Sequence, residues 1–238
     1  MKNADAFYPP LSSSLSKDNR EGTMGLDLTE LQTRGWAIVD GISSGEDLLA
    51  LGKTLGVPAQ TPNGELVKEI RRLPKDTAPP GSQSALYGAG PFPLHTDTVF
   101  WPLPVRYVLL RGYGDTRRPT TIRSFAELVA DCGEEFHARS RDSVWLVAAG
   151  PKPFYCSLQF QHGSTSGWRY DFDLMTPANA DAEHVNDILK PLAAADGVPG
   201  ITWSGNQAVV ISNWHVLHGR GPQPPDEGIR VIERLYVR

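Results

Sequence analysis

The sequence predicts a mainly β fold with a few inserted helices, a jelly roll or barrel rather than a parallel α/β sheet. Short apolar runs recur along the chain, and turn-forming residues separate them, with 23 glycines and 20 prolines among 238 residues. Helical periodicity is confined to a few segments that do not alternate regularly with these runs. A chain of this length fits a single domain of this kind.

Four segments are predicted as helices. The first ends at Gly35 and the second at Gly56, since glycine commonly follows the last helical residue. Pro191 is expected to kink or end the last of them, because proline cannot donate the helical hydrogen bond. The four segments are residues 26–33, 45–55, 124–139 and a stretch that begins at 176–177.

The predicted strands are mostly short and lie between glycines and prolines. Residues 1–24 are expected to form a flexible N-terminal arm, and residues 25–238 a single domain. Residues 60–90 are rich in Pro, Gly and charge, which makes a lid plausible there. The strands are predicted at residues 36–39, 66–70, 105–111, 121–122, 144–148, 154–160, 168–172, 201–203, 208–212 and 229–237.

Composition excludes several classes of protein. The formal net charge is -4 with no block of like charge, so neither a nucleic-acid partner nor a membrane partner is expected. No apolar run approaches the roughly 20 residues of a spanning helix. Two cysteines, Cys132 and Cys156, argue against a disulfide scaffold and predict a cytoplasmic protein. A small-molecule substrate is expected, and the sequence leaves a homo-oligomer open.

The first chemical motif is a His-x-Asp pair, His95 and Asp97. Side chains two apart on a strand point the same way, so the imidazole and the carboxylate can supply adjacent positions around a metal ion. A hydrogen-bonded surface pair is the alternative interpretation of so short a pattern.

The second motif, residues 213–221, offers His215 and His218. These residues are three apart and face opposite sides of a strand, so only one of them can join the site. Gly219, which follows His218, would let the backbone approach closely and turn away. Two histidines and one carboxylate with open coordination positions form the site of non-haem Fe(II) oxygenases.

The third motif, residues 228–237, places Arg230 and Arg234 on one strand face together with Ile232 and Tyr236, and Glu233 on the other. Guanidinium groups that point inward need anionic partners, and arginine is suited to gripping a carboxylate. Two exposed arginines on an edge strand are the alternative.

In order and spacing, these three motifs resemble the taurine dioxygenase and 2,4-dichlorophenoxyacetate dioxygenase family, also called clavaminate-synthase-like. The resemblance runs from about Trp36 to the C-terminus. It implies a double-stranded β-helix, which is a cupin-like jelly roll, and a dioxygenase that uses Fe(II), 2-oxoglutarate and O2. Such an enzyme oxidises a small anionic or amino-acid-like molecule, most often by hydroxylation, and releases succinate and CO2.

The resemblance also implies roles for individual residues. His95, Asp97 and His218 would be the iron ligands and the catalytic centre, which leaves His215 a structural role. Arg230 would grip the distal carboxylate of 2-oxoglutarate, with help from Thr121 or, alternatively, Thr120. Arg234 matches a position that binds an anionic group of the substrate. Competing hypotheses are a cupin-like zinc hydrolase or isomerase and a non-catalytic binding module. The paired arginines favour the oxygenase.

Overall fold

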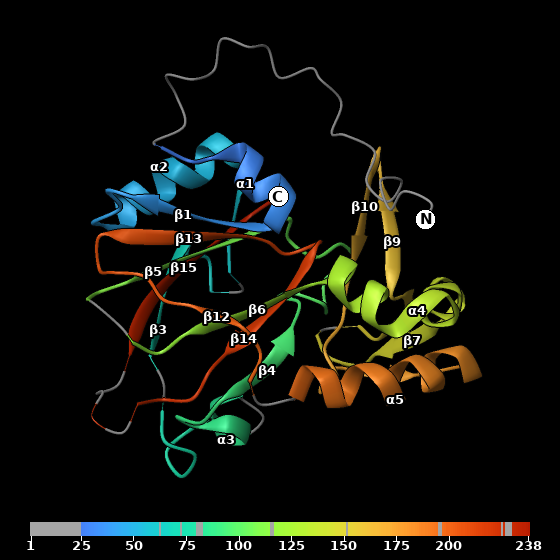
Figure 1. Ribbon diagram of the computed structural model, residues 1–238. Coiled ribbons are helices and arrows are strands. Elements are labelled where there is room, and N and C mark those ends of the chain that lie inside the picture. Colours follow the sequence, from blue (N-terminus) through green and yellow to red (C-terminus); the bar gives the residue numbers. More distant parts are fainter. Residues whose placement is uncertain are drawn as a thin grey trace.

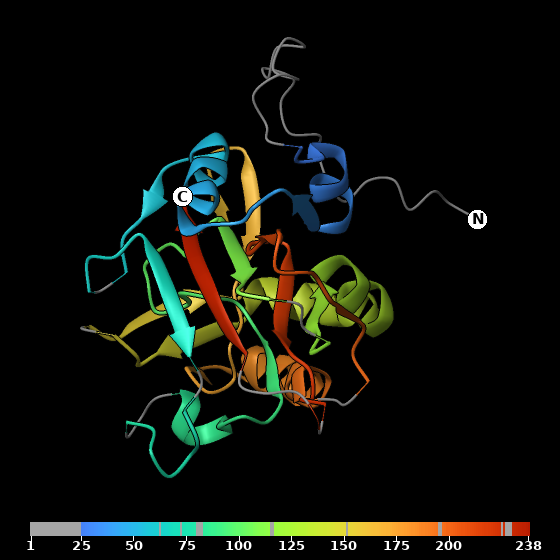
Figure 2. The ribbon, with the colours of Figure 1, turned by 90° about the vertical axis from the view of Figure 1, so that its left-hand side faces the viewer.

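The computed structural model describes residues 25–238 except 62, 72, 80–82, 115, 116, 151, 195, 196, 225 and 227–229. The predicted N-terminal arm lies outside the described residues. Two antiparallel sheets face each other, and helices lie on their outer sides (Figure 1; Figure 2 shows the same ribbon turned by 90°). None of the helices in these described ranges is long and apolar enough to cross a membrane.

The larger of these two sheets, called the main sheet below, has six strands. Five follow the order β1-β13-β5-β15-β2, and the sixth, β3, also pairs with β15. Two of its members, β13 and β5, lie at its centre and are buried along most of their length. Its strands are β1 (Trp36–Asp40), β2 (Pro58–Ala59), β3 (Val67–Arg71), β5 (Tyr107–Gly112), β13 (Gln207–Ser212) and β15 (Val231–Val237).

The smaller one, here the second sheet, has the order β12-β6-β14-β4. It consists of β4 (Phe92–His95), β6 (Thr120–Ser124), β12 (Gly200–Ile201) and β14 (Val216–Arg220). Apolar side chains from both sheets fill the space between them. This interior cluster includes Val108 and Leu110 of β5, Tyr236 of β15, Ile122 of β6 and Val216 of β14.

Alternation along the strands decides which residues face this interior. On β14, Val216 belongs to the interior cluster, whereas its neighbour Leu217 packs outward against helices. On β15, Tyr236 faces the interior, and Leu235 and Val237 pack on the other side. These contacts confirm the strand faces that the sequence predicts for β15.

Helices cover both outer faces (Figure 1). α1 (Leu28–Arg34) and α2 (Gly45–Leu55) pack on the main sheet, where Leu31, Leu48 and Leu51 are buried. Both helices begin at polar N-caps, Asp27 and Ser44, that accept backbone N–H groups. These caps explain why the predicted boundaries are nearly correct.

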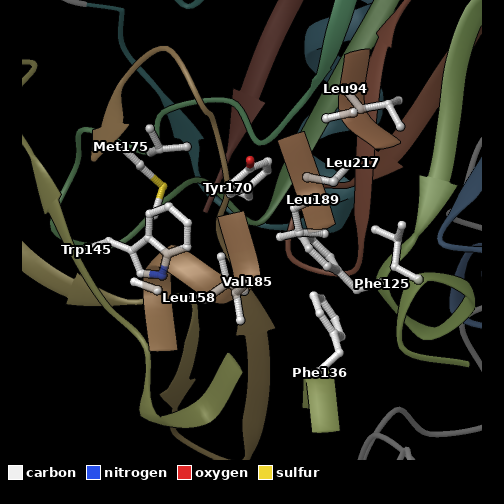
Figure 3. Packing of buried hydrophobic residues seen from close by; sticks show 14 of the residues in the cluster. Leu94, Phe125, Phe136, Trp145, Leu158, Tyr170, Met175, Val185, Leu189 and Leu217 are labelled. Carbon is white, nitrogen blue, oxygen red and sulfur yellow. The ribbon is translucent and has the colours of Figure 1, made fainter. Parts of the chain in front are cut away.

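The outer face of the second sheet packs on a further apolar cluster (Figure 3). Trp145 and Tyr170 meet edge to face there, with ring centroids 5.7 Å apart, and Leu217 of β14 joins them. The elements around it are α4 (Phe125–Asp142), β7 (Val144–Val147), β8 (Phe154–Ser157), β9 (Gln159–His162), β10 (Thr165–Trp168), β11 (Met175–Pro177) and α5 (Ala180–Ala194).

Some predicted elements are wrong in detail. The last helix does not begin at 176–177, because these residues pair with β7 as strand β11. Of the two expectations for Pro191, ending the helix is wrong, because α5 continues through the proline to Ala194 and loses only the one hydrogen bond that a proline cannot donate. Residues 154–160 form parts of two strands, not one. Residues 169–172 are not a strand, since the Asp171 carboxylate accepts the Asp173 and Leu174 N–H groups and turns the chain.

The described residues between 60 and 90 form two separate elements, the strand β3 and the short helix α3 (Gln83–Tyr87). β3 joins the main sheet and confirms the strand predicted there. α3 and the three residues after it, Gly88–Ala89–Gly90, lead directly into β4. This second part lies close to the candidate site.

Candidate metal centre

The described residues contain one cluster of potential metal ligands, formed by His95, Asp97 and His218. Their ligand atoms all lie within 4.8 Å of one another, and all three side chains are buried. Strand pairing produces this arrangement, because His218 of β14 lies directly opposite His95, the last residue of β4. The two imidazole centroids are 4.7 Å apart.

Asp97 is held in place through its own backbone, which the side chain of Asn213 binds. Its N–H donates to Asn213 Oδ1 at 2.9 Å, and Asn213 Nδ2 donates back to the Asp97 carbonyl at 3.1 Å. Between the two ligands, Thr96 exchanges hydrogen bonds with the backbone of Tyr170. Asn213 therefore positions the carboxylate; the sequence motif contains this residue, but its role is not apparent without the structure.

The histidine rings are oriented so that their Nε2 atoms point to Asp97. His95 Nδ1 lies 3.1 Å from the Pro93 carbonyl and can donate its proton there. His95 Nε2 is then free as a lone-pair donor, 3.8 Å from Asp97 Oδ1, and His218 Nε2 lies 3.4 Å from Asp97 Oδ2. Two imidazole nitrogens and a carboxylate that converge in this way fit a divalent transition-metal ion.

The surroundings keep the carboxylate ionised. Burial by itself would raise the pKa of Asp97, but Arg234 and the two histidines outweigh burial and hold it well below its usual range. Burial lowers the pKa of His218. Its Nδ1 atom has no hydrogen-bond partner among the residues that the structure describes.

Arg234 points into the interior, where its Nη1 lies 3.3 Å from Asp97 Oδ1 and its guanidinium 4.3 Å from the Tyr236 ring. Glu233 faces away and binds Arg111 at 2.6 Å and Tyr113 at 3.0 Å. The carboxylate next to Arg234 is thus Asp97, a ligand candidate.

Asp171 and Asp173, two acids from the turn after β10, have hydrogen-bond partners other than Arg234. Asp171 accepts backbone N–H groups of the turn that follows it. Asp173 accepts the Tyr87 hydroxyl at 2.6 Å.

Arg230 also points inward. Its guanidinium stacks over the Trp203 ring at 4.2 Å and donates from Nη1 to the Arg118 carbonyl at 3.1 Å. Partial burial lowers the pKa of Arg220, at the end of β14, to about 9, and the like charge of Arg230 adds to this effect. No role was predicted for Arg220 from the sequence. Its position two residues after His218 on one strand, and therefore on the same face, is the pattern that could have identified it.

The register between β6 and β14 separates the two candidate threonines. Thr120 lies opposite Arg220, so it shares the interior face with Arg220 and His218, and it is buried. Thr121 lies opposite Gly219 on the outer face. The structure thus brings Thr120, not Thr121, to the side of the ligand cluster.

His215 lies outside the cluster. It lies in the turn between β13 and β14, and its Nδ1 is 2.8 Å from Oγ of Ser212, the last residue of β13. Of the two histidines that the second motif offers, only His218 therefore approaches His95 and Asp97.

Known proteins resemble this chain in structure and not detectably in sequence. No family model and no curated protein sequence matches it. Asparagine oxygenase, in complex with Fe(II), hydroxyasparagine and succinate, superposes with a TM-score of 0.69 at 14% identity, over 88% of this chain and 76% of that one.

Two further solved structures give similar values. The non-haem iron oxygenase OrfP, in complex with Fe, succinate and (3S)-hydroxy-L-Arg, has a TM-score of 0.67 at 18% identity, over 88% and 79% of the two chains. PvcB from Pseudomonas aeruginosa has a TM-score of 0.63 at 14% identity, over 87% and 77%. The predicted double-stranded β-helix is thereby confirmed: the chain has the fold of known non-haem iron oxygenases.

Proposed function

We propose that this protein is an Fe(II)- and 2-oxoglutarate-dependent dioxygenase that hydroxylates a small, anionic or amino-acid-like molecule. The observation that carries the proposal is the buried convergence of His95, Asp97 and His218 in an interior that also contains Arg230 and Arg234. We further propose that it is a distant relative of the taurine dioxygenase family and acts in the cytoplasm, consistent with its two free cysteines.

The donor set supports iron. Two neutral imidazoles and one carboxylate leave open positions on a metal that prefers six ligands, and this set is typical of non-haem Fe(II) oxygenases. When bound, the iron would supply the activation of O2, with 2-oxoglutarate as the source of two electrons and succinate and CO2 as products. His95 and His218 would present Nε2 to the metal, and Asp97 would present its carboxylate.

The interior arginines argue for the oxygenase against a zinc hydrolase or a binding module. A metal site for hydrolysis requires no second cationic group for a dicarboxylate, whereas Arg230 is suited to hold the distal carboxylate of 2-oxoglutarate by a paired contact. Thr120 lies on the same face as His218 and can donate its hydroxyl to that carboxylate. We therefore assign this supporting role to Thr120 in preference to Thr121.

The substrate class follows from Arg234 and from the similar proteins. Arg234 lies beside the metal ligands and binds only Asp97 among the described carboxylates. A bound metal ion would neutralise much of the negative charge of Asp97. Arg234 would then be available to an anionic group of the substrate. Asparagine oxygenase and OrfP, which have the same fold, were solved with hydroxylated amino acids. An amino-acid carboxylate fits both observations.

The test combines binding and turnover. Anaerobic addition of Fe(II) and 2-oxoglutarate to the purified protein should produce a visible charge-transfer absorption, and aerobic incubation with pooled amino acids should release succinate. Arg230→Ala should raise the 2-oxoglutarate requirement several hundredfold or more, since removing one partner of a buried charged pair costs about 3–5 kcal/mol. Tight zinc binding without any 2-oxoglutarate binding would contradict the proposal.

A further inference from the structure

Trp203 is a buried tryptophan in the connection between β12 and β13, which links the second sheet to the main sheet. Its side chain belongs to the interior cluster, as does that of Ile201, two residues earlier on β12. Ile201 lies opposite Thr120 in the register of β12 and β6. Strand pairing therefore brings Trp203 to the part of the interior that contains the threonine proposed to help bind 2-oxoglutarate.

Trp203 contacts Arg230 with the face of its ring. The guanidinium carbon of Arg230 lies 4.2 Å from the ring centroid, well within the roughly 6 Å at which a cation and an aromatic face attract each other. Tryptophan gives the strongest attraction of this kind among the aromatic side chains. The indole N–H of Trp203 has no hydrogen-bond partner in the described part of the chain. Toward its described neighbours, Trp203 thus acts through its ring and not through its polar edge.

Two contacts together fix the orientation of the Arg230 guanidinium. Stacking on Trp203 sets the plane of the group, and the hydrogen bond from Nη1 to the Arg118 carbonyl, 3.1 Å long, limits rotation within that plane. A guanidinium presents its N–H donors only in its own plane, so a two-bond grip on a carboxylate requires that both the plane and the rotation be correct.

The Arg118 carbonyl is held in place by the side chain of the same residue. This buried guanidinium donates from Nε to the Gly221 carbonyl at 3.0 Å. Its Nη2 donates to the Gly90 carbonyl at 2.9 Å and also to that of Ala89. These bonds anchor the chain just before β6 to the residues before β4 and to the residue after β14. The acceptor that Arg230 uses is therefore fixed from two sides.

We propose that Trp203 is a positioning residue that preorganises Arg230 for the distal carboxylate of 2-oxoglutarate. This inference rests on the proposed function. Without the ring, the long arginine side chain samples other orientations, and the apparent affinity falls with the fraction of molecules in which Arg230 is correctly oriented. Trp203 acts on this carboxylate through Arg230, so it should not influence binding of the keto-acid group at the other end of the molecule.

Two matched keto acids separate this role from a purely structural one. 2-Oxoglutarate carries the distal carboxylate, whereas 2-oxopentanoate has the same keto-acid group and chain length with a methyl group in its place. Binding of each to the Fe(II) protein is titrated anaerobically in wild type, Trp203→Leu and Trp203→Phe. Trp145→Leu is the control, because Trp145 is also buried but lies in the cluster outside the second sheet (Figure 3).

For Trp203→Leu we expect the affinity for 2-oxoglutarate to fall by about five- to thirtyfold, the loss of a desolvated cation–ring contact, while that for 2-oxopentanoate stays within about twofold. Trp203→Phe should restore most of the affinity, because it keeps an aromatic face and removes no hydrogen bond that the described residues make. Trp145→Leu should lower the unfolding temperature but leave the ratio of the two affinities unchanged.

A double-mutant comparison tests whether Trp203 acts through Arg230. In an Arg230→Ala protein the distal carboxylate has lost its proposed partner, so adding Trp203→Leu should leave the ratio of the two affinities unchanged. A further loss of 2-oxoglutarate affinity in this background would mean that Trp203 acts on the carboxylate by another route, and it would refute the inference.

Fluorinated tryptophan supplies a second readout that decides the question if Trp203→Leu does not fold. Fluorine draws electron density from the ring face and so weakens its attraction for a cation, with little change in volume. Incorporation of singly and triply fluorinated tryptophan should lower the affinity for 2-oxoglutarate stepwise and leave that for 2-oxopentanoate unchanged. All six tryptophans are replaced in this way, so Trp203→Phe is the control, in which the stepwise loss should disappear.

The outcomes separate this inference from the proposed function. A wild-type protein that binds no 2-oxoglutarate refutes both together. If wild type binds 2-oxoglutarate, the proposed function stands, and the inference is refuted by normal 2-oxoglutarate binding in Trp203→Leu, by equal losses for both keto acids, or by an affinity that does not respond to fluorination.

Discussion

Gly219→Ala tests whether close packing of β14 on β4 shapes the metal centre. A Cβ atom at this position would lie 2.6 Å from the Phe92 carbonyl oxygen, 2.8 Å from that of Pro93 and 2.8 Å from Thr121 Oγ1. The first two are backbone atoms of β4, which cannot rotate away as a flexible side chain could. The two strands must therefore move apart by several tenths of an ångström.

The strain should appear both in stability and in metal binding. Overpacking of this kind costs about 1–3 kcal/mol in the free energy of unfolding. The strands that separate carry His95 and His218, and metal sites tolerate ligand displacements of only about 0.2 Å. We expect metal affinity to fall by about ten- to hundredfold, comparable to the loss of a group that orients a ligand.

Urea unfolding and Fe(II) or Co(II) titration of the purified variant measure the two effects. Gly114→Ala is the matched control, because a Cβ there meets no described atom within 4 Å. The control should change neither quantity by more than about 0.5 kcal/mol, as is usual for surface substitutions. If Gly219→Ala unfolds at the wild-type urea concentration and binds metal with wild-type affinity, close strand packing does not shape the site.

Two further comparisons test the site assignments. His218→Ala should abolish Fe(II) binding in a metal titration, whereas His215→Ala, which removes a side chain outside the ligand cluster that contacts Ser212, should retain it; the reverse result would exchange their roles. Thr120→Val should raise the 2-oxoglutarate concentration needed for half-maximal binding by about tenfold or more, the loss of one hydrogen bond to a charged group, whereas Thr121→Val should leave it unchanged. Equal effects of the two threonine substitutions would show that the strand register does not decide this subsite.

Local patterns were sufficient for much of the fold. The helix at Gly45–Leu55 is correctly bounded because Ser44 and Asp47 form a capping box, which needs only neighbouring residues. The faces of β15 are correct because a strand alternates with a period of two, whatever it packs against. The turn at residues 169–172 was missed because the Asp171 carboxylate competes with strand pairing, and the pattern there still resembles a strand.

By itself, the sequence determined the fold class, the His95-x-Asp97 pair and the common face of Arg230 and Arg234, since each depends on spacing along one segment. Only the tertiary structure decided which partners these groups meet. Thr120 shares the interior face with His218 because of the β6–β14 register, and Arg234 lies against Asp97 because β15 and the end of β4 approach each other. Arg220 likewise meets the Gly88 and Gly90 carbonyls across 130 positions or more of chain. Strand register and sheet packing are non-local, so no periodicity within a single segment can specify them.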